Sequence, residues 1–320
     1  MANEHWFQIK ETENAEWKFQ FMLWAAIHLP LKWIECFAAV IVFFFYLGAS
    51  PVRKRSRLYL EHVFAMRNQK VPHFAVYRHI LAFALSMVEK IRGWAGKINL
   101  SELETQNDDI DKLIESLDSG EGAFVLCSHL GNIEAIRSLT GFRKEHTHRI
   151  FQVFPVVDFS GTRKFNTILH KLNPSLMKNA FDANTIGPDS VIAMHEKIAS
   201  GNLIAIAGDR TSSHFEKRQI SLPFLGENAA FPEGAFTLAC VLKAPVYFIF
   251  AFRKKDLDIT SPYEFHVIRS SVTWTGKRSE QKKKIAELAA EFTSHLEHFC
   301  LQHPYQWYNF YNFWSKGESS

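Results

Sequence analysis

From about residue 108 onward, short apolar runs alternate with stretches of helical periodicity. The two clearest runs, Ala123–Cys127 (AFVLC) and Leu203–Ala207 (LIAIA), contain no polar position, which is typical of parallel strands covered on both faces. Further strands are expected at 149–157, 245–252 and 264–269, the last of them at a sheet edge.

Helical patterns separate these runs, at 108–117, 188–200, 232–243 and 279–302. The alternation predicts an α/β fold with a mostly parallel central sheet flanked by helices. In such sheets, ligands collect at the carboxyl ends of the strands. Residues that directly follow a predicted strand are therefore the first candidates for chemistry.

The N-terminal part has another pattern. Residues 33–52 read WIECFAAVIVFFFYLGASPV, with Glu35 as the only charge, and twenty helical residues rise about 30 Å, the thickness of a hydrocarbon core. Trp24 and Trp33 suit the headgroup region. A basic cluster that anionic lipids would attract follows directly: Arg53, Lys54, Arg55 and Arg57. We expect a membrane-anchoring segment at 1–57 and a second domain at 58–320, helical over 58–100.

The order of charges around the apolar run indicates its orientation. The leader is acidic and the basic residues follow the run, which disfavours a cleaved signal peptide. The positive-inside rule then places residues 53–320 in the cytoplasm. Two alternatives stay open: the run lies in the membrane interface, or it is a buried first helix of a soluble domain.

Composition excludes several function classes. Lys and Arg number 37 and Asp and Glu 33, a net charge of +4 that is too small to indicate nucleic-acid binding. The four cysteines are scattered and form no CxxC pair, so neither a zinc ribbon nor a disulfide framework is expected. There is no HExxH, dinucleotide or P-loop motif, and we expect neither a metal nor a cofactor.

His129 carries the strongest chemical signal. It follows the predicted strand Ala123–Cys127, and Glu134 comes five positions later, in the first turn of the next helix if Gly131 permits a tight bend. A carboxylate that holds one imidazole nitrogen leaves the other as a general base. Without further context, such a histidine is more often an ordinary hydrogen-bonded residue.

Six segments give this context, in one order along the chain: His-x4-Glu at 129–134, GDR at 208–210, LPFLG at 222–226, FPEG at 231–234, APV at 244–246 and QWYNFYNFW at 306–314. Together they resemble the lysophospholipid acyltransferase superfamily, above all its branch of bacterial lipid A lauroyl and myristoyl transferases. The resemblance extends over about residues 20–315. It implies a glycerolipid acyltransferase-like fold.

The resemblance also implies an activity. A fatty acyl chain would pass from an acyl carrier protein or coenzyme A thioester to a hydroxyl or amine of a lipid acceptor, at the cytoplasmic face of the bacterial inner membrane, with a single N-terminal anchor. His129 would act as general base and Glu134 would orient it. The chain has no GxSxG elbow, which is consistent with direct attack and no acyl-enzyme.

The remaining site candidates are substrate-binding residues. Arg163 falls where the family has a second arginine-bearing block, and Arg163 and Arg210 are candidates for phosphate recognition. Asp209 is expected to hold either Arg210 or the His129 region. Asn132 and Glu233 are the two further substrate-binding candidates. The alternatives are a solvated charge for Arg163 and a favourable helix-dipole partner for Glu233.

The chain departs from the lipid A branch at two places. Asn309, Phe310 and Tyr311 stand where those enzymes tend to have a His-Arg pair, and Asp209-Arg210 replaces their Asp-Gln. These departures indicate a sub-branch with another acceptor, closer to the acyltransferases found beside aryl polyene or other lipid biosynthesis genes. Two other functions remain open: a non-catalytic peripheral lipid-binding protein and an acyl thioesterase.

Overall fold

A mixed seven-stranded sheet forms the centre of the described structure. The computed structural model describes residues 23–95, 103–105, 109–132, 149–159, 179–210, 218–274, 277–311 and 313–314. Within them the strand order is β1-β9-β8-β2-β5-β3-β4. The bounds are β1 Leu103–Thr105, β2 Ala123–Cys127, β3 Val153–Val157, β4 Phe181–Asp182, β5 Leu203–Ala207, β8 Val246–Arg253 and β9 Tyr263–Arg269.

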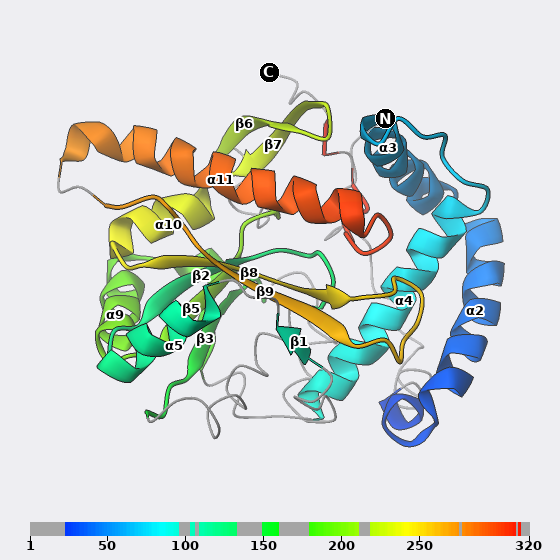
Figure 1. Cartoon of the computed structure of the whole chain (residues 1–320), viewed down its shortest axis with the longest axis horizontal. Coiled ribbons are helices and arrows are strands. Elements are labelled where there is room, and N and C mark those ends of the chain that lie inside the picture. Colours follow the sequence, from blue (N-terminus) through cyan, green and yellow to red (C-terminus); the bar gives the residue numbers. More distant parts are fainter. Residues whose placement is uncertain are drawn as a thin grey trace.

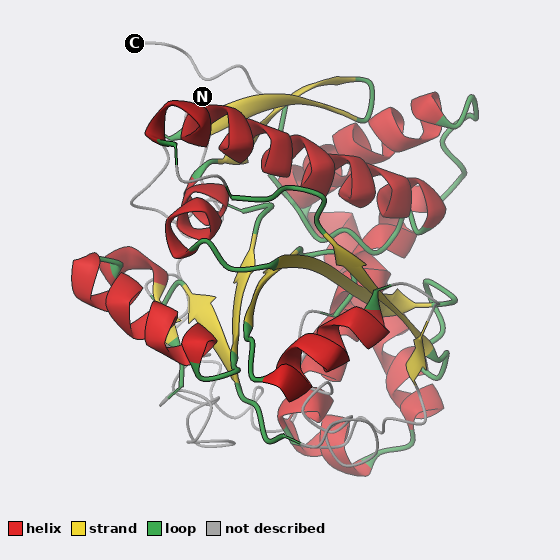
Figure 2. Ribbon diagram, turned by 60° about the vertical axis from the view of Figure 1, so that its left-hand side comes forward, coloured by secondary structure: helices red, strands yellow, loops and turns green. Residues whose placement is uncertain are grey.

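The predicted α/β class is confirmed. Strands β8, β2, β5, β3 and β4 are parallel, and β9 is antiparallel to β8. Helix α5 (Ile110–Ser119) packs on one face of the sheet. On the other face, the described residues form three helices: α9 (Pro188–Ala199), α10 (Gly234–Leu242) and α11 (Gln281–Gln302). Figure 2 shows the sheet between these helices, which is why β2 contains only apolar residues.

Some predicted bounds need correction. Strand β9 is not at the sheet edge, because β1 pairs with its other side. The expected helix 232–243 begins at Gly234, since Pro232 still belongs to strand β7 (Glu227–Pro232). β7 forms an antiparallel hairpin with β6 (Gln219–Phe224), which the sequence pattern did not reveal.

Three helices lie at the side of the sheet that is far from α9. They are α2 (Leu31–Gly48), α3 (Ser50–Met66) and α4 (Ala75–Trp94), and Figure 1 shows α2 alongside α4. The helical stretch expected over 58–100 is therefore interrupted at 67–74, where Asn68 and Phe74 adopt left-handed backbone conformations. The expected domain boundary at residue 57 falls inside α3. Within the described residues, α2 is the one helix long and apolar enough to cross a membrane.

Candidate active site

His129 and Asp209 meet at the carboxyl edge of the sheet. Cys127 and Ala207 are register partners at the ends of β2 and β5, and each of the two polar residues lies two positions farther along its chain. His129 Nδ1 lies 2.8 Å from Asp209 Oδ1, and the His129 backbone N–H donates to Oδ2 at 2.8 Å. The carboxylate is fully buried, whereas the His129 side chain is 20% exposed.

The Asp209 carboxylate is ionised. Burial opposes its charge, but the hydrogen bonds from His129 and the positive charge of Arg210 outweigh burial and lower the pKa of Asp209 below its ordinary value. A third donor, Trp307 Nε1, lies 2.9 Å from Oδ2. The two oxygens are thus held from several directions, which fixes the orientation of the carboxylate.

This arrangement determines the protonation state of His129. An ionised carboxylate only accepts hydrogen bonds, so Nδ1 carries the proton and Nε2 of the neutral ring is left to accept one. Burial and the nearby charge of Arg210 lower the pKa of His129 to about 4, although Asp209 acts in the opposite direction. At neutral pH the imidazole is therefore uncharged, as a general base must be.

A C-terminal segment, residues 306–309, holds the loop that carries His129. Leu130 and Trp307 form an antiparallel β-bridge. The Gly131 N–H donates to the Gln306 carbonyl at 2.8 Å, and the Tyr308 N–H donates to the His129 carbonyl at 3.1 Å. The loop after β2 thus gains backbone partners on both sides of His129.

Gly131 confirms the expected tight bend. Its φ is +69°, and a Cβ at this position would lie 2.1 Å from the Ala251 carbonyl oxygen. The neighbouring Asn132 N–H donates to the same oxygen at 2.7 Å. The loop passes so close to β8 that only glycine fits.

Arg210 is directed toward the segment 306–309. Its guanidinium donates to the Tyr308 carbonyl at 2.7 Å and to Asn309 Oδ1 at 3.1 and 3.2 Å. Arg210 and Asn309 stand at the two positions where the resemblance implies a departure from the lipid A branch, and the structure shows that they are contact partners. The two departures therefore form one local change next to Asp209.

The other predicted site residues lie elsewhere or outside the described part. The Asn132 side chain is buried and donates to the Tyr263 hydroxyl at 3.4 Å. Glu233 stands directly before α10 and is partly exposed, which fits the helix-dipole interpretation. Glu134 and Arg163 lie outside the described residues.

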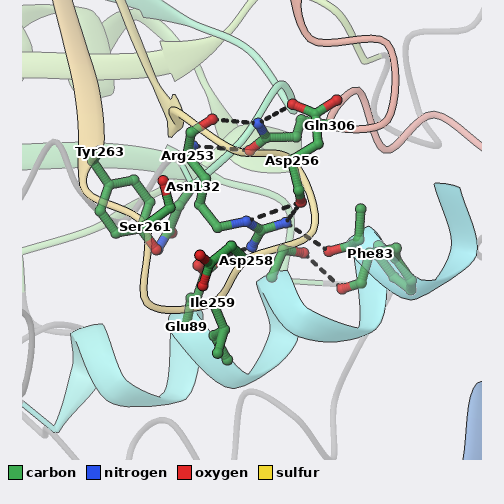
Figure 3. A network of polar contacts seen from close by, with 12 residues as sticks. Phe83, Glu89, Asn132, Arg253, Asp256, Asp258, Ile259, Ser261, Tyr263 and Gln306 are labelled. Carbon is green, nitrogen blue, oxygen red and sulfur yellow. Dashed lines mark hydrogen bonds and ion pairs between the residues drawn. The ribbon is translucent and has the colours of Figure 1, made fainter. Parts of the chain in front are cut away.

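A buried polar network that sequence analysis missed supports the segment 306–309. Arg253, at the end of β8, pairs with Glu89 of α4 at 2.5 Å, and both side chains are buried. The Gln306 amide donates to the Arg253 carbonyl at 2.7 Å and to Asp256 Oδ1 at 2.8 Å, and it accepts from the Arg253 N–H at 2.9 Å. Figure 3 shows the Arg253 guanidinium between α4 and the turn that contains Asp256.

His79 of α4 holds the same segment from the other side. Its Nε2 lies 2.8 Å from the Trp307 carbonyl, and its Nδ1 lies 2.8 Å from Ser56 Oγ. Since a carbonyl only accepts, Nε2 donates, and Nδ1 accepts from the hydroxyl. Burial lowers the pKa of His79 to about 4, so the ring is neutral. Trp307 is thus fixed through its backbone as well as its indole.

The described residues contain no group of three or more His, Cys, Asp or Glu side chains that could hold a metal ion. Within the described residues, the site consists of the His129 imidazole and the Asp209 carboxylate, supported by hydrogen bonds. This arrangement can take a proton from an incoming nucleophile and stabilise the resulting imidazolium.

Comparison with protein-family models gives one match that covers nearly the whole chain. Residues 7–316 match the model of the bacterial lipid A biosynthesis acyltransferases. Among curated proteins the sequence finds no significant match.

Proposed function

Because the chain belongs to the bacterial lipid A biosynthesis acyltransferase family, we propose that it transfers a fatty acyl chain from a thioester to a hydroxyl or amine of a lipid acceptor, with His129 as the general base. The hydrogen bond between His129 Nδ1 and Asp209 Oδ1 carries this proposal. It leaves Nε2 unprotonated on a side chain that is partly accessible, in an otherwise buried site.

The proposed reaction is direct acyl transfer. His129 Nε2 takes the proton of the acceptor hydroxyl as its oxygen attacks the thioester carbonyl carbon. The C–O bond forms, the C–S bond breaks, and the leaving thiolate takes the proton from the imidazolium. Asp209 stabilises the imidazolium between these steps, as the carboxylate of a catalytic triad does. The thioester is the donor substrate, and the proposed steps use no cofactor.

Glu134 remains an alternative partner for His129, since the family resemblance assigns the orienting carboxylate to this position. Asp209 is favoured because it already occupies Nδ1. Arg163 and Arg210 remain candidates for a substrate phosphate, with Asn132 and Glu233 as further substrate-binding candidates. Part of the Arg210 guanidinium is engaged by Asn309, which supports a role in shaping the site beside any contact with substrate.

The proposed location is the cytoplasmic face of the bacterial inner membrane. The family is membrane-associated, and the exposed face of α2 is apolar. The acceptor is a lipid, either lipid A or the lipid of a related pathway, because Arg210 and Asn309 differ from the lipid A branch. The donor is an acyl carrier protein or coenzyme A thioester.

Thiol release from acyl carrier protein and coenzyme A thioesters tests the proposal. The full chain in detergent is incubated with each donor, with and without a bacterial lipid extract, and lipids are analysed by mass spectrometry. We expect thiol release that depends on added lipid, together with one new acylated lipid, and neither with His129→Ala. Free acid without lipid would instead identify a thioesterase, and lipid binding without thiol release would identify a lipid-binding protein.

A further inference from the structure

The outward face of α2 is apolar along its whole length. Only two side chains of this 18-residue helix, Ile34 and Val42, are buried. After Lys32 in the first turn, the large exposed side chains of the helix are apolar: Trp33, Phe37, Val40, Ile41, Phe43, Phe44, Phe45 and Leu47. An apolar surface about 22 Å long, at 1.5 Å per residue from Trp33 to Leu47, is therefore uncovered in the described structure.

The inward face of α2 is attached to the rest of the protein at its beginning. Lys32 Nζ lies 2.7 Å from Asp258 Oδ1. The Ile259 N–H donates to Glu35 Oε2 at 3.1 Å. Asp258 and Ile259 belong to the turn between β8 and β9, so the first turn of α2 is held against the sheet domain.

The middle and the end of α2 are attached as well. The Tyr77 hydroxyl of α4 donates to the Ala39 carbonyl at 2.9 Å, and Arg53 of α3 donates to the Tyr46 carbonyl at 2.8 Å. Arg92, near the end of α4, donates to the carbonyl of Ala26, just before α2, at 3.2 Å. Figure 1 shows α2 and α4 side by side, and these contacts make them antiparallel.

These attachments determine how α2 can enter a membrane. A crossing α2 would draw α4 and the turn between β8 and β9 into the bilayer, and this turn contains charged side chains: Lys254, Lys255, Asp256 and Asp258. Charged groups and irregular backbone are costly in the hydrocarbon region unless protein or water surrounds them. The sheet domain also holds α4 through the Glu89–Arg253 ion pair. To leave the domain, α2 would have to break the part-buried hydrogen bonds to Tyr77 and Ile259 and expose its buried side chains Ile34 and Val42.

We propose that α2 does not cross the membrane but lies lengthwise in the cytoplasmic leaflet, with its apolar face in lipid and both ends on the side of the His129 site. The proposal rests on the membrane attachment proposed above. An apolar helix face in this position enters about 5–10 Å into the headgroup and acyl boundary. Exposed Lys54 and Arg57, which follow α2, lie where anionic headgroups would bind them.

Cysteine labelling from the two sides of the membrane tests this topology. Cys36 is exposed and the other three cysteines are buried, so the full-length Cys36→Ser protein serves as the unlabelled background. His28→Cys and Lys54→Cys then flank α2. With a membrane-impermeant maleimide, we expect both to react in inverted inner-membrane vesicles and neither in spheroplasts. Reaction of His28→Cys in spheroplasts would overturn the proposal.

Spin-label depth gives an independent measurement. Trp33, Val40 and Leu47 lie on one line of the exposed face, seven residues apart. In a helix that lies lengthwise, collision with dissolved oxygen and with a water-soluble nickel complex reports similar depths at all three positions. In a spanning helix, the label at Val40 is deeper than the other two by about 10 Å, which would contradict the proposal.

Membrane fractionation distinguishes a failure of the proposed membrane attachment from a failure of the proposed topology. If the wild-type protein stays in the soluble fraction, the proposed membrane attachment is wrong, and the topology is wrong with it. If the protein pellets with membranes but His28→Cys reacts from the opposite side, only the topology is wrong. The acyl transfer assay does not depend on either result.

Discussion

Trp307 Nε1 donates to Oδ2 of Asp209 at 2.9 Å, and the other oxygen of this carboxylate lies 2.8 Å from Nδ1 of His129. The indole therefore controls the direction in which the carboxylate holds the imidazole. Trp307 is fully buried, so in the proposed mechanism it would act through Asp209, as a positioning residue.

Trp307→Phe is expected to lower kcat by about tenfold to a hundredfold. It keeps an aromatic ring but removes a hydrogen bond that orients the Asp209 carboxylate, so the imidazole is held less accurately, and small misplacements of catalytic groups can cost about a hundredfold in rate. Because the Asp209 carboxylate then accepts one hydrogen bond fewer, it attracts the His129 proton more strongly and raises the pKa of His129. The acid limb of the kcat/KM profile therefore moves to higher pH. Trp314→Phe is the matched control, since Trp314 Nε1 donates to the Phe224 carbonyl. An unchanged pH profile would show that Trp307 has only a structural role.

Asp209→Asn is expected to lower kcat by about 10³- to 10⁴-fold, as in enzymes where the carboxylate that orients a catalytic histidine is replaced. Acyl transfer by this variant is compared with transfer by Glu134→Gln and by Asp111→Asn, an exposed control on α5. If Glu134→Gln is the more damaged variant and Asp209→Asn is nearly unaffected, Glu134 is the partner of His129.

Glu89→Gln is expected to lower the free energy of unfolding by about 3–5 kcal/mol, because it leaves the buried Arg253 charge without its partner. Urea unfolding of the full chain measures the change. Glu287→Gln is the control: Glu287 forms ion pairs with Lys283 and Lys284 at the surface, and its loss is expected to cost no more than about 0.5 kcal/mol. Equal effects of the two substitutions would contradict the prediction.

Ile41→Asp is expected to move a large part of the protein from the membrane pellet to the soluble fraction. Ile41 is 68% exposed on α2, and a carboxylate there would have to enter the lipid. Ile192, on α9, is 58% exposed, and Ile192→Asp should leave the distribution unchanged. Sedimentation of membranes followed by immunoblotting compares the two. If both variants stay in the pellet, the face around Ile41 does not bind the membrane.

The free energy of unfolding is expected to fall as the pH is lowered from about 6.5 to 4. His79 has a pKa of about 4 in the folded protein, below the ordinary 6.5, so over this range the unfolded state binds more protons. The slope for this one group approaches about 1.4 kcal/mol per pH unit. Urea unfolding at several pH values compares wild type with His79→Gln, which should have a shallower slope. The pKa of His129 is also lowered to about 4, so His129 contributes to the slope of both proteins. Equal slopes for wild type and His79→Gln would therefore show that His79 does not contribute.

The strands β2 and β5 were predictable because both of their faces are covered, which requires continuous apolar runs. The position of His129 at a strand end followed from the same pattern. Its link to Asp209 depends on β2 and β5 being neighbours, and a one-dimensional pattern does not contain that adjacency. The sequence alone therefore favours Glu134, five positions away, as the partner of His129. It does not decide whether Asp209 binds Arg210 or the His129 region.

Other features lie beyond local patterns. Trp307 and Asp209 are 98 positions apart, and Arg253 and Glu89 are 164 positions apart. Strand β1 has three residues, too few for a periodic signal, and its presence makes β9 an inner strand. The Gln-Trp pair at 306–307 is part of the motif that carries the family resemblance. Only the structure shows that Gln306 binds Arg253 and Asp256 and that Trp307 binds Asp209.

The backbone pairing of residues 129–131 with residues 306–308 has a consequence for biosynthesis. A growing chain that has left the ribosome only as far as α11 already contains His129 and Asp209, but it lacks the indole and carbonyl groups that fix them. If the proposed function is correct, we expect such a chain not to react with thioesters until residues 306–308 pair with the loop that carries His129.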